Sequence, residues 1–131
     1  MRVFEKAILT AVFVTLSGSF NPPPTPVGTP LSADDFRHDL VDLPLCGTPS
    51  GGPLAGKAMC TIHFADGSAM LAGSGVVARG FWQFAGDTIC RRDQHAPVEA
   101  ERCVRYERLS DGRYRNSDGV TMCIGPCVAE R

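Results

Sequence analysis

Six cysteines in a chain of 131 residues constrain the fold more than any other feature of the sequence. Behind an export signal, an even number of cysteines in a small chain predicts a disulfide framework rather than a pool of free thiols. Sequence alone does not choose rigorously among the pairings. We favour Cys90–Cys103, because the two residues lie on expected strands joined by a polar loop. The remaining local pairs are Cys46–Cys60 and Cys123–Cys127, and an exchange between them, such as Cys60–Cys123, stays open.

The first residues have the pattern of an export signal. Arg2 and Lys6 precede residues 7–20, which hold no charge. That apolar run is shorter than the roughly 20 residues that span a bilayer core, and it suits the apolar region of a signal peptide. Ser17 and Ser19 fit a cleavage site. We therefore expect a signal peptide over residues 1–19 and a periplasmic or secreted protein without a stable membrane span after cleavage. An uncleaved membrane anchor is the alternative.

Composition divides the rest of the chain. Residues 20–30 form a proline-rich spacer, because proline fixes φ and removes backbone donors. We expect a single disulfide-stabilised domain over residues 31–127 and a C-terminal tail over residues 128–131. A core of this size gives little stability margin, so covalent staples are physically useful. The net charge of −1 gives no reason to expect nucleic acid as a partner.

One helix start is clear in the sequence. Ser32 is a good N-cap, and Asp35 three residues later completes a capping box. An apolar stripe follows at helical spacing, made of Phe36, Leu40 and Leu43. The pattern predicts a short helix over Ala33–Leu43 that ends at Pro44.

From Lys57 onward the period changes to two, and Asp-Gly pairs at residues 66–67, 111–112 and 118–119 mark tight turns. Residues 68–77 read as one strand, in which Gly73 and Gly75 suggest a bulge or a close crossing of the backbone. The chain then holds roughly six short strands. The predicted fold class is α+β: one short N-terminal helix packed on a small, twisted antiparallel β-sheet, either a meander or a partly open barrel, stapled by disulfides.

Alternation assigns side chains to the two faces of the expected sheet. In the strand after Lys57 the more apolar face carries Cys60, Ile62 and Phe64, and the other face carries Met59, Thr61 and His63. Phe81, Trp82 and Phe84 are expected first in the core, and second as the lining of a ligand cavity.

The spacing Cys-x3-Cys at Cys123 and Cys127 is the sharpest candidate for chemistry. Two thiolates could bind a soft metal such as copper or carry out thiol–disulfide exchange. However, redox motifs of that kind begin a helix, which lowers the thiol pKa, and only four residues follow Cys127. A structural disulfide is therefore the favoured interpretation.

No catalytic signature is present in the sequence. His38, His63 and His95 have no metal-ligand spacing and are expected on the surface or partly packed. Patterns such as G-x-S-x-G and the phosphate-binding glycine loops are absent. Carboxylates that converge in space would be needed for a hydrolase, and nothing in the spacing argues for them. The sequence predicts neither a cofactor nor an enzyme.

Arginines gather in residues 79–115, where eight of them stand against six acids. A patch on neighbouring strands could hold a small anionic ligand, since the guanidinium fork suits carboxylate or phosphate. The favoured alternative is a solvated face balanced by acids. The candidate ligand-binding residues are Arg105, Tyr106, Arg113 and Trp82.

The order of motifs resembles a family of small exported bacterial proteins of uncharacterised function. The residues that carry the resemblance are LSADDFRHDLVDLPLCG, FADGSAML, GFW followed by DTIC, and RCVRYERLSDGRYR. The family pattern has a short helix ending in glycine, and here Asp42 stands in its place. Cys46, Cys60 and the Cys-x3-Cys tail are additions that imply a more heavily stapled branch. The resemblance implies a small antiparallel β fold outside the cytoplasm and brings no catalytic residues.

These observations lead to one functional expectation and one alternative. We expect a non-enzymatic binding or cell-envelope-associated module, whose partner is a small anionic ligand or an envelope protein. The alternative is a soft-metal or thiol-redox protein that uses Cys123 and Cys127, with a hydrolase as a distant third.

Overall fold

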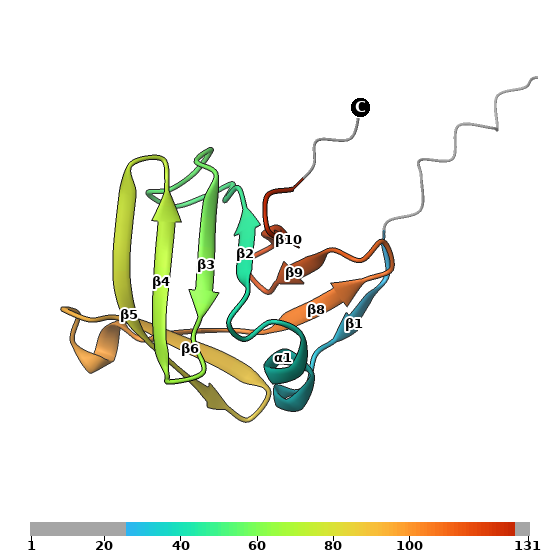
Figure 1. Cartoon of the computed structure of the whole chain (residues 1–131), viewed down its shortest axis with the longest axis horizontal. Helices are drawn as coiled ribbons and strands as arrows, with labels where there is room; N and C mark the ends of the chain where they lie inside the picture. The colour runs from blue at the N-terminus through green and yellow to red at the C-terminus, as the bar shows by residue number, and fades with distance from the viewer. Residues whose placement is uncertain (1–25, 128–131) are drawn as a thin grey trace, which may run out of the picture.

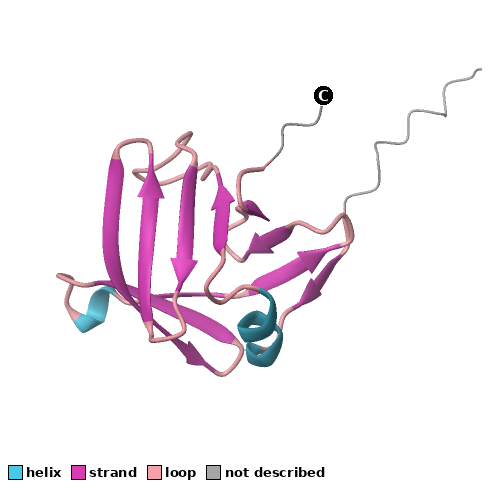
Figure 2. Cartoon of the chain, in the orientation of Figure 1, coloured by secondary structure: helices cyan, strands magenta, loops and turns pink. Residues whose placement is uncertain are grey.

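The computed structural model describes residues 26–127, which fold mostly as antiparallel β-sheet (Figure 2). Ten strands lie in one open sheet in the order β1-β8-β9-β10-β2-β3-β4-β5-β6-β7. The predicted signal peptide and tail lie outside the described residues. The elements are β1 (Gly28–Pro30), α1 (Ala33–Asp39), β2 (Pro44–Gly47), β3 (Met59–His63), β4 (Ser68–Gly73), β5 (Val76–Ala85), β6 (Thr88–Asp93), the 3-10 helix η1 (Val98–Ala100), β7 (Arg102–Val104), β8 (Tyr106–Leu109), β9 (Tyr114–Asn116) and β10 (Thr121–Ile124).

The antiparallel sheet, the single short α-helix and the disulfides agree with the sequence-based expectation. The α+β class does not, because one seven-residue helix beside ten strands makes a mostly β protein. β2 to β7 form a continuous meander in chain order. No helix in residues 26–127 is long and apolar enough to cross a membrane.

The strand count exceeds six for local reasons. β1 comes from the end of the proline-rich segment and pairs with β8. The strand expected over residues 68–77 is two strands, because Ser74 and Gly75 form a two-residue turn between the paired residues Gly73 and Val76. Both turn residues have positive φ, 50° and 79°, as tight hairpin turns require. No bulge forms here, but the close approach expected as the alternative does occur at Gly73, where a Cβ would lie 2.3 Å from the Ala58 carbonyl oxygen.

The sheet curls strongly (Figure 1), and two places along the chain account for the curl. β7 pairs with β6, whereas β8 pairs with β1 and β9, and Arg105 alone separates β7 from β8. β7, at one end of the sheet order, is thus joined through one residue to β8, which lies next to the strand at the other end. β5 pairs with β4 along its first half and with β6 along its second, and Gly80 pairs with both. A Cβ at Gly80 would lie 2.1 Å from the Arg92 carbonyl oxygen, so this crossing requires glycine.

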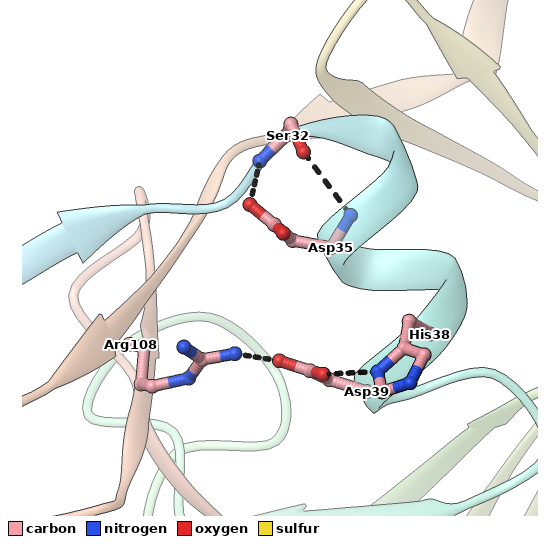
Figure 3. Close-up of polar contacts among 5 residues, drawn as sticks. All are labelled: Ser32, Asp35, His38, Asp39 and Arg108. Atoms are coloured by element: carbon pink, nitrogen blue, oxygen red, sulfur yellow. Dashed lines mark hydrogen bonds and ion pairs between the residues drawn. The ribbon is translucent and has the colours of Figure 1, made fainter.

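Helix α1 begins as the sequence predicts. The Ser32 hydroxyl accepts from the Asp35 amide at 3.1 Å, and the Asp35 carboxylate accepts from the Ser32 amide at 3.2 Å (Figure 3). These hydrogen bonds lower the pKa of Asp35. Farther along the helix, Asp39 forms an ion pair with Arg108 on β8 (Figure 3). The helix is therefore capped at its start and tied to the sheet at its end.

The helix ends at Asp39, four residues before the predicted end at Leu43. Asp42 has a φ of 67°, the left-handed conformation that often follows a helix. Its amide donates to the His63 carbonyl at 2.8 Å, and its carboxylate accepts from the Ala65 amide at 2.9 Å. Asp42 thus adopts the positive φ that the family pattern assigns to a glycine. Its two hydrogen bonds fix the chain after the helix to the β3–β4 hairpin.

The core lies between α1 and the concave side of the sheet. Phe36 and Leu40 are fully buried. Four rings from three strands surround Phe36 at centroid distances of 5.1–5.9 Å, namely His63, Trp82, Phe84 and Tyr106. We call this helix-covered part of the molecule the closed end. Trp82 and Phe84 belong to it as predicted, whereas Phe81 is half exposed on the outer side of β5.

The face assignment of β3 was reversed. Met59 and His63 are buried, and Thr61 lies between them on the same side of the strand. Cys60 and Ile62 point to the outer side. His63, expected on the surface or partly packed, has no exposed area at all. The error arose because two of the apolar residues on this strand serve the outer face, one of them as half of a disulfide.

Three disulfides staple the outer side of the sheet. Cys46–Cys60 joins β2 to β3 at directly paired positions, and Cys90–Cys103 joins β6 to β7 in the same way. Cys123–Cys127 closes a short loop after β10. These are the local pairs that the sequence favours, and the exchanged pair Cys60–Cys123 does not form. No free cysteine remains among the described residues.

Candidate functional site

The sheet interior is filled at the closed end and hollow at the opposite end, which we call the open end. A cavity of about 790 Å³ lies there. Its walls come from β2 to β7, from β9 and β10 and from the turn between these two strands. Residues 49–54 and the residues Ala96 and Ala100 also border it. Clefts of roughly 300–1,000 Å³ are typical of small-molecule sites. The cavity is therefore the candidate functional site.

Strand alternation explains which side chains line this cavity. Residues two apart on a strand share a face, so the core residue His63 places Thr61 and Met59 on the inner side of β3. Leu71 pairs with both Thr61 and Ala78, which brings β4 and β5 to the same wall. The apolar lining includes Leu45, Met59, Leu71, Ala78, Val120 and Met122.

Arg91 supplies a charge inside this partly apolar lining. It stands two residues after the buried Ile89, so it shares the inner face of β6. Its guanidinium donates to the Thr61 hydroxyl at 3.4 Å. β3 and β6 are separated by two strands in the sheet, so this contact crosses the inside of the curl. Arg91 therefore lies at the floor of the cavity, between the cavity and the closed end.

Two residues flank Arg91 across the ladder. Trp82 on β5 and Arg102 on β7 are its directly paired neighbours, and paired residues point to the same face. The Trp82 indole N–H donates to the Phe64 carbonyl at 2.7 Å, which fixes the ring. Arg102 is mostly exposed and lies 3.7 Å from the Asp118 carboxylate at the cavity rim. Arg91 itself has no carboxylate within ion-pairing distance in residues 26–127.

His63 lies directly beyond Arg91 on the closed side. Burial first, and the positive charge of Arg91 second, lower the pKa of His63 to about 3. Both ring nitrogens are buried without a hydrogen-bond partner among the described residues. His63 is consequently a neutral aromatic wall at neutral pH, and Arg91 is the charged group at this depth.

The structure does not gather the four ligand-binding residues predicted from sequence. Tyr106 is buried in the closed end, where burial raises its pKa. Arg105 is exposed in the link between β7 and β8. Arg113 is bonded to Asp111 at the β8–β9 turn. Only Trp82 lies beside the candidate site, as the cross-strand neighbour of Arg91.

Many of the remaining arginines are balanced by acids, as the favoured interpretation of the sequence expected. Arg115 pairs with Glu107, Arg108 with Asp39 and Arg37 with Asp34. Tyr106 and the neighbouring Tyr114 are buried in the core, so neither ring borders an exposed group of arginines.

The cysteines offer no thiolate site in this structure. Cys123 and Cys127, the candidates for copper or redox chemistry, are joined to each other. One group of potential metal ligands occurs in residues 26–127, formed by Cys90, Glu101 and Cys103. Its two sulfurs are consumed in a disulfide, so it cannot present the thiolates that a metal requires.

Sequence reasoning missed Arg91 because it adjoins Arg92, and nothing local distinguishes the two. Arg92 points outward, where its guanidinium lies 5.8 Å from the centre of the Phe81 ring. The usable signal was the disulfide. If Cys90 faces outward, its neighbours Ile89 and Arg91 must face inward. No protein-family model, curated protein or solved structure matches the chain, so the candidate site stands on its own geometry.

Proposed function

We propose that this chain is an exported, non-enzymatic binding module that holds a small molecule in the cavity at the open end of its sheet. The observation that carries the proposal is the contrast within one sheet interior. The closed end is packed by α1 and aromatic rings, whereas the open end keeps about 790 Å³ between strands fixed by disulfides. Pre-formed, mostly apolar cavities with a few polar groups are typical of ligand sites.

Two features support a binding role over catalysis. Two arginines and two aspartates line the inner side of the cavity in addition to apolar side chains, namely Arg91, Arg102, Asp93 and Asp118. Neither carboxylate contacts a histidine side chain or a thiol in the described residues. His63, the histidine nearest the cavity, is buried behind Arg91. The site therefore offers shape and positive charge, which favour binding, and it offers no nucleophile activated by a neighbouring base.

A fluorescent probe tests the proposal. N-phenylnaphthylamine is neutral and apolar, and its emission rises when it enters a dry cavity. We expect saturable binding to the native protein. Ala78→Phe places a ring inside the cavity and should abolish binding. Val77→Phe is the matched control, because Val77 points outward and is 68% exposed. Equal binding by both variants would contradict the proposal.

The second candidate, a soft-metal or redox protein, requires free thiols at Cys123 and Cys127. Intact mass of the exported protein, before and after alkylation under denaturing conditions, tests it together with export. Our proposal predicts a mature chain that starts near Phe20 and takes up no alkylating reagent. Two alkylated cysteines at Cys123 and Cys127 would favour the redox candidate instead.

A further inference from the structure

The cavity floor carries a charge whose partner is not part of the described chain. Arg91 is half-buried, and its guanidinium has one hydrogen bond in the structure, to Thr61. A guanidinium offers five N–H donors in a planar fork that matches a carboxylate. Charges removed from water are costly unless they are paired. The remaining donors therefore face the cavity without a carboxylate from residues 26–127 to receive them.

Neighbouring acids do not take this role. Asp93 is two residues farther along β6, and its carboxylate accepts from the His95 amide at 2.9 Å, within its own loop. Asp118 lies at the rim, 3.7 Å from Arg102. Both acids thus lie nearer the mouth, and the floor keeps a single unbalanced positive charge.

The other residues that line the cavity indicate which chemical group the ligand carries besides its anionic group. Leu71, Ala78 and Met59 come from β3 to β5, and Met122 and Leu45 face them from β10 and β2. These side chains offer an apolar surface that a hydrocarbon group can cover. A ligand that satisfies both parts has one anionic group and an apolar body.

We propose that the cavity binds a small amphipathic monocarboxylate, whose carboxylate pairs with Arg91 and whose apolar body lies against Met59, Leu71 and Met122. One guanidinium balances one negative charge. A dianionic phosphate would leave excess charge in a partly desolvated site, which is unfavourable. The inference rests on the proposed function, since it names the ligand class of the same cavity.

Binding of dodecanoate, measured by calorimetry below its micelle concentration, tests the inference against dodecanol and dodecyl phosphate. We expect dodecanoate to bind at least about tenfold more tightly than dodecanol, as a charge-assisted hydrogen-bonded pair allows. Trp82 is the only tryptophan of the chain and neighbours Arg91, so its fluorescence should change on binding. Equal affinity for dodecanoate and dodecanol, or tighter binding of dodecyl phosphate, would overturn the inference.

Variants assign the preference to the residue. Arg91→Met keeps the length of the side chain and should remove the preference for dodecanoate over dodecanol, whereas Arg91→Lys should retain part of it. Arg105→Met is the matched control, because it removes an exposed charge between β7 and β8 that does not line the cavity. N-phenylnaphthylamine should still bind to Arg91→Met, which shows an intact cavity. If that probe binds but Arg91→Met keeps the full preference, the ligand class is wrong while the proposed function stands. If the probe does not enter the native cavity, the proposed function itself fails.

Discussion

The two ends of this molecule use the same inner face of one sheet in opposite ways. At the closed end a seven-residue helix inserts Phe36 and Leu40 among aromatic rings, and no exposed area remains on either side chain. At the open end the same strands present Thr61, Ala78 and Arg91 around a cavity. In this curled sheet, side chains fill the interior at the closed end and leave a cavity at the open end. The helix determines which end becomes core and which stays available to a ligand.

The hydrogen bonds around the helix explain why it stays at one end. Its first amide, that of Ala33, donates to the Asp87 carboxylate in the β5–β6 turn. Asp39 pairs with Arg108 on β8, and Asp42 is bonded to the β3–β4 hairpin. A helix this short is marginal alone. Contacts with three separate parts of the sheet hold it over the closed end.

The largest effect should come from removing the central ring of the closed end. Phe36→Ala should lower the free energy of unfolding by about 3–5 kcal/mol, because it leaves a cavity among packed rings. The matched change at the open end, Leu71→Ala, should cost roughly 1 kcal/mol, because Leu71 already borders a cavity. Denaturant unfolding measures both. Similar losses for the two variants would mean that the ends do not differ in packing.

The staple beside the open end should come next. Replacing Cys90 and Cys103 together by Ala should lower stability by about 3 kcal/mol, from the chain entropy of the loop that they close. The corresponding double change at Cys123 and Cys127 should cost less, about 2 kcal/mol, since its loop is shorter. Because the residues adjoining Cys90 and Cys103 are Arg91 and Arg102, only the first variant should also weaken probe binding. If both double variants weakened probe binding equally, the Cys90–Cys103 disulfide would not be what positions Arg91 and Arg102.

The closed end should also make the protein sensitive to mild acid. In the unfolded chain His63 titrates near 6.5, whereas burial first, and Arg91 second, lower its folded pKa to about 3. The unfolded state therefore binds more protons between these values, and stability falls as the pH drops from about 6.5 toward 3. The expected slope approaches about 1.4 kcal/mol per pH unit.

Denaturant unfolding at several pH values between 7 and about 5 measures this slope. In this range Asp35, Asp66 and Asp111, whose pKa values hydrogen bonds lower in the folded state, are ionised in the folded and the unfolded chain and add nothing to it. His63→Leu is the informative variant, because it keeps an apolar side chain of similar size. Its stability should depend much less on pH over this range. A slope unchanged by the substitution would place the sensitive group elsewhere.

The smallest effect is expected at the join between helix and sheet. Asp42→Ala should cost about 1 kcal/mol, because alanine loses the hydrogen bond to Ala65 and tolerates positive φ poorly. Asp42→Asn should stay near the native stability, since asparagine accepts the same bond and adopts the same conformation. Thermal unfolding distinguishes them. A loss as large for Asn as for Ala would show that the carboxylate charge, rather than the geometry, matters here.

Sequence reasoning succeeded where the determining interaction is local. The capping box at Ser32 and Asp35, the Asp-Gly turns and the short-range disulfides all depend on residues close in the chain. It failed where the answer depends on curvature. Alternation tells which residues of β3 share a face, but only the closed sheet shows that the face with Thr61 and His63 lies inside.

The candidate site was missed for the same reason. Arg91 and Thr61 lie on β6 and β3, which do not pair, and their side chains meet only because the sheet curls. The sequence does not show how close Arg91 and Thr61 lie in space. The predicted residue Tyr106 carries a polar group and neighbours several arginines, yet its ring is needed in the core.

The most direct test of this account follows backbone amides by two-dimensional NMR during a titration with dodecanoate. The account predicts that shifts concentrate at the open end, on Thr61, Leu71, Ala78 and Arg91, while Phe36 and Leu40 in the closed end stay unchanged. Shifts that map instead to exposed residues outside the cavity lining, such as Val27 and Ile124, or that spread evenly over both ends, would contradict the claim that the hollow end of the sheet is the binding site.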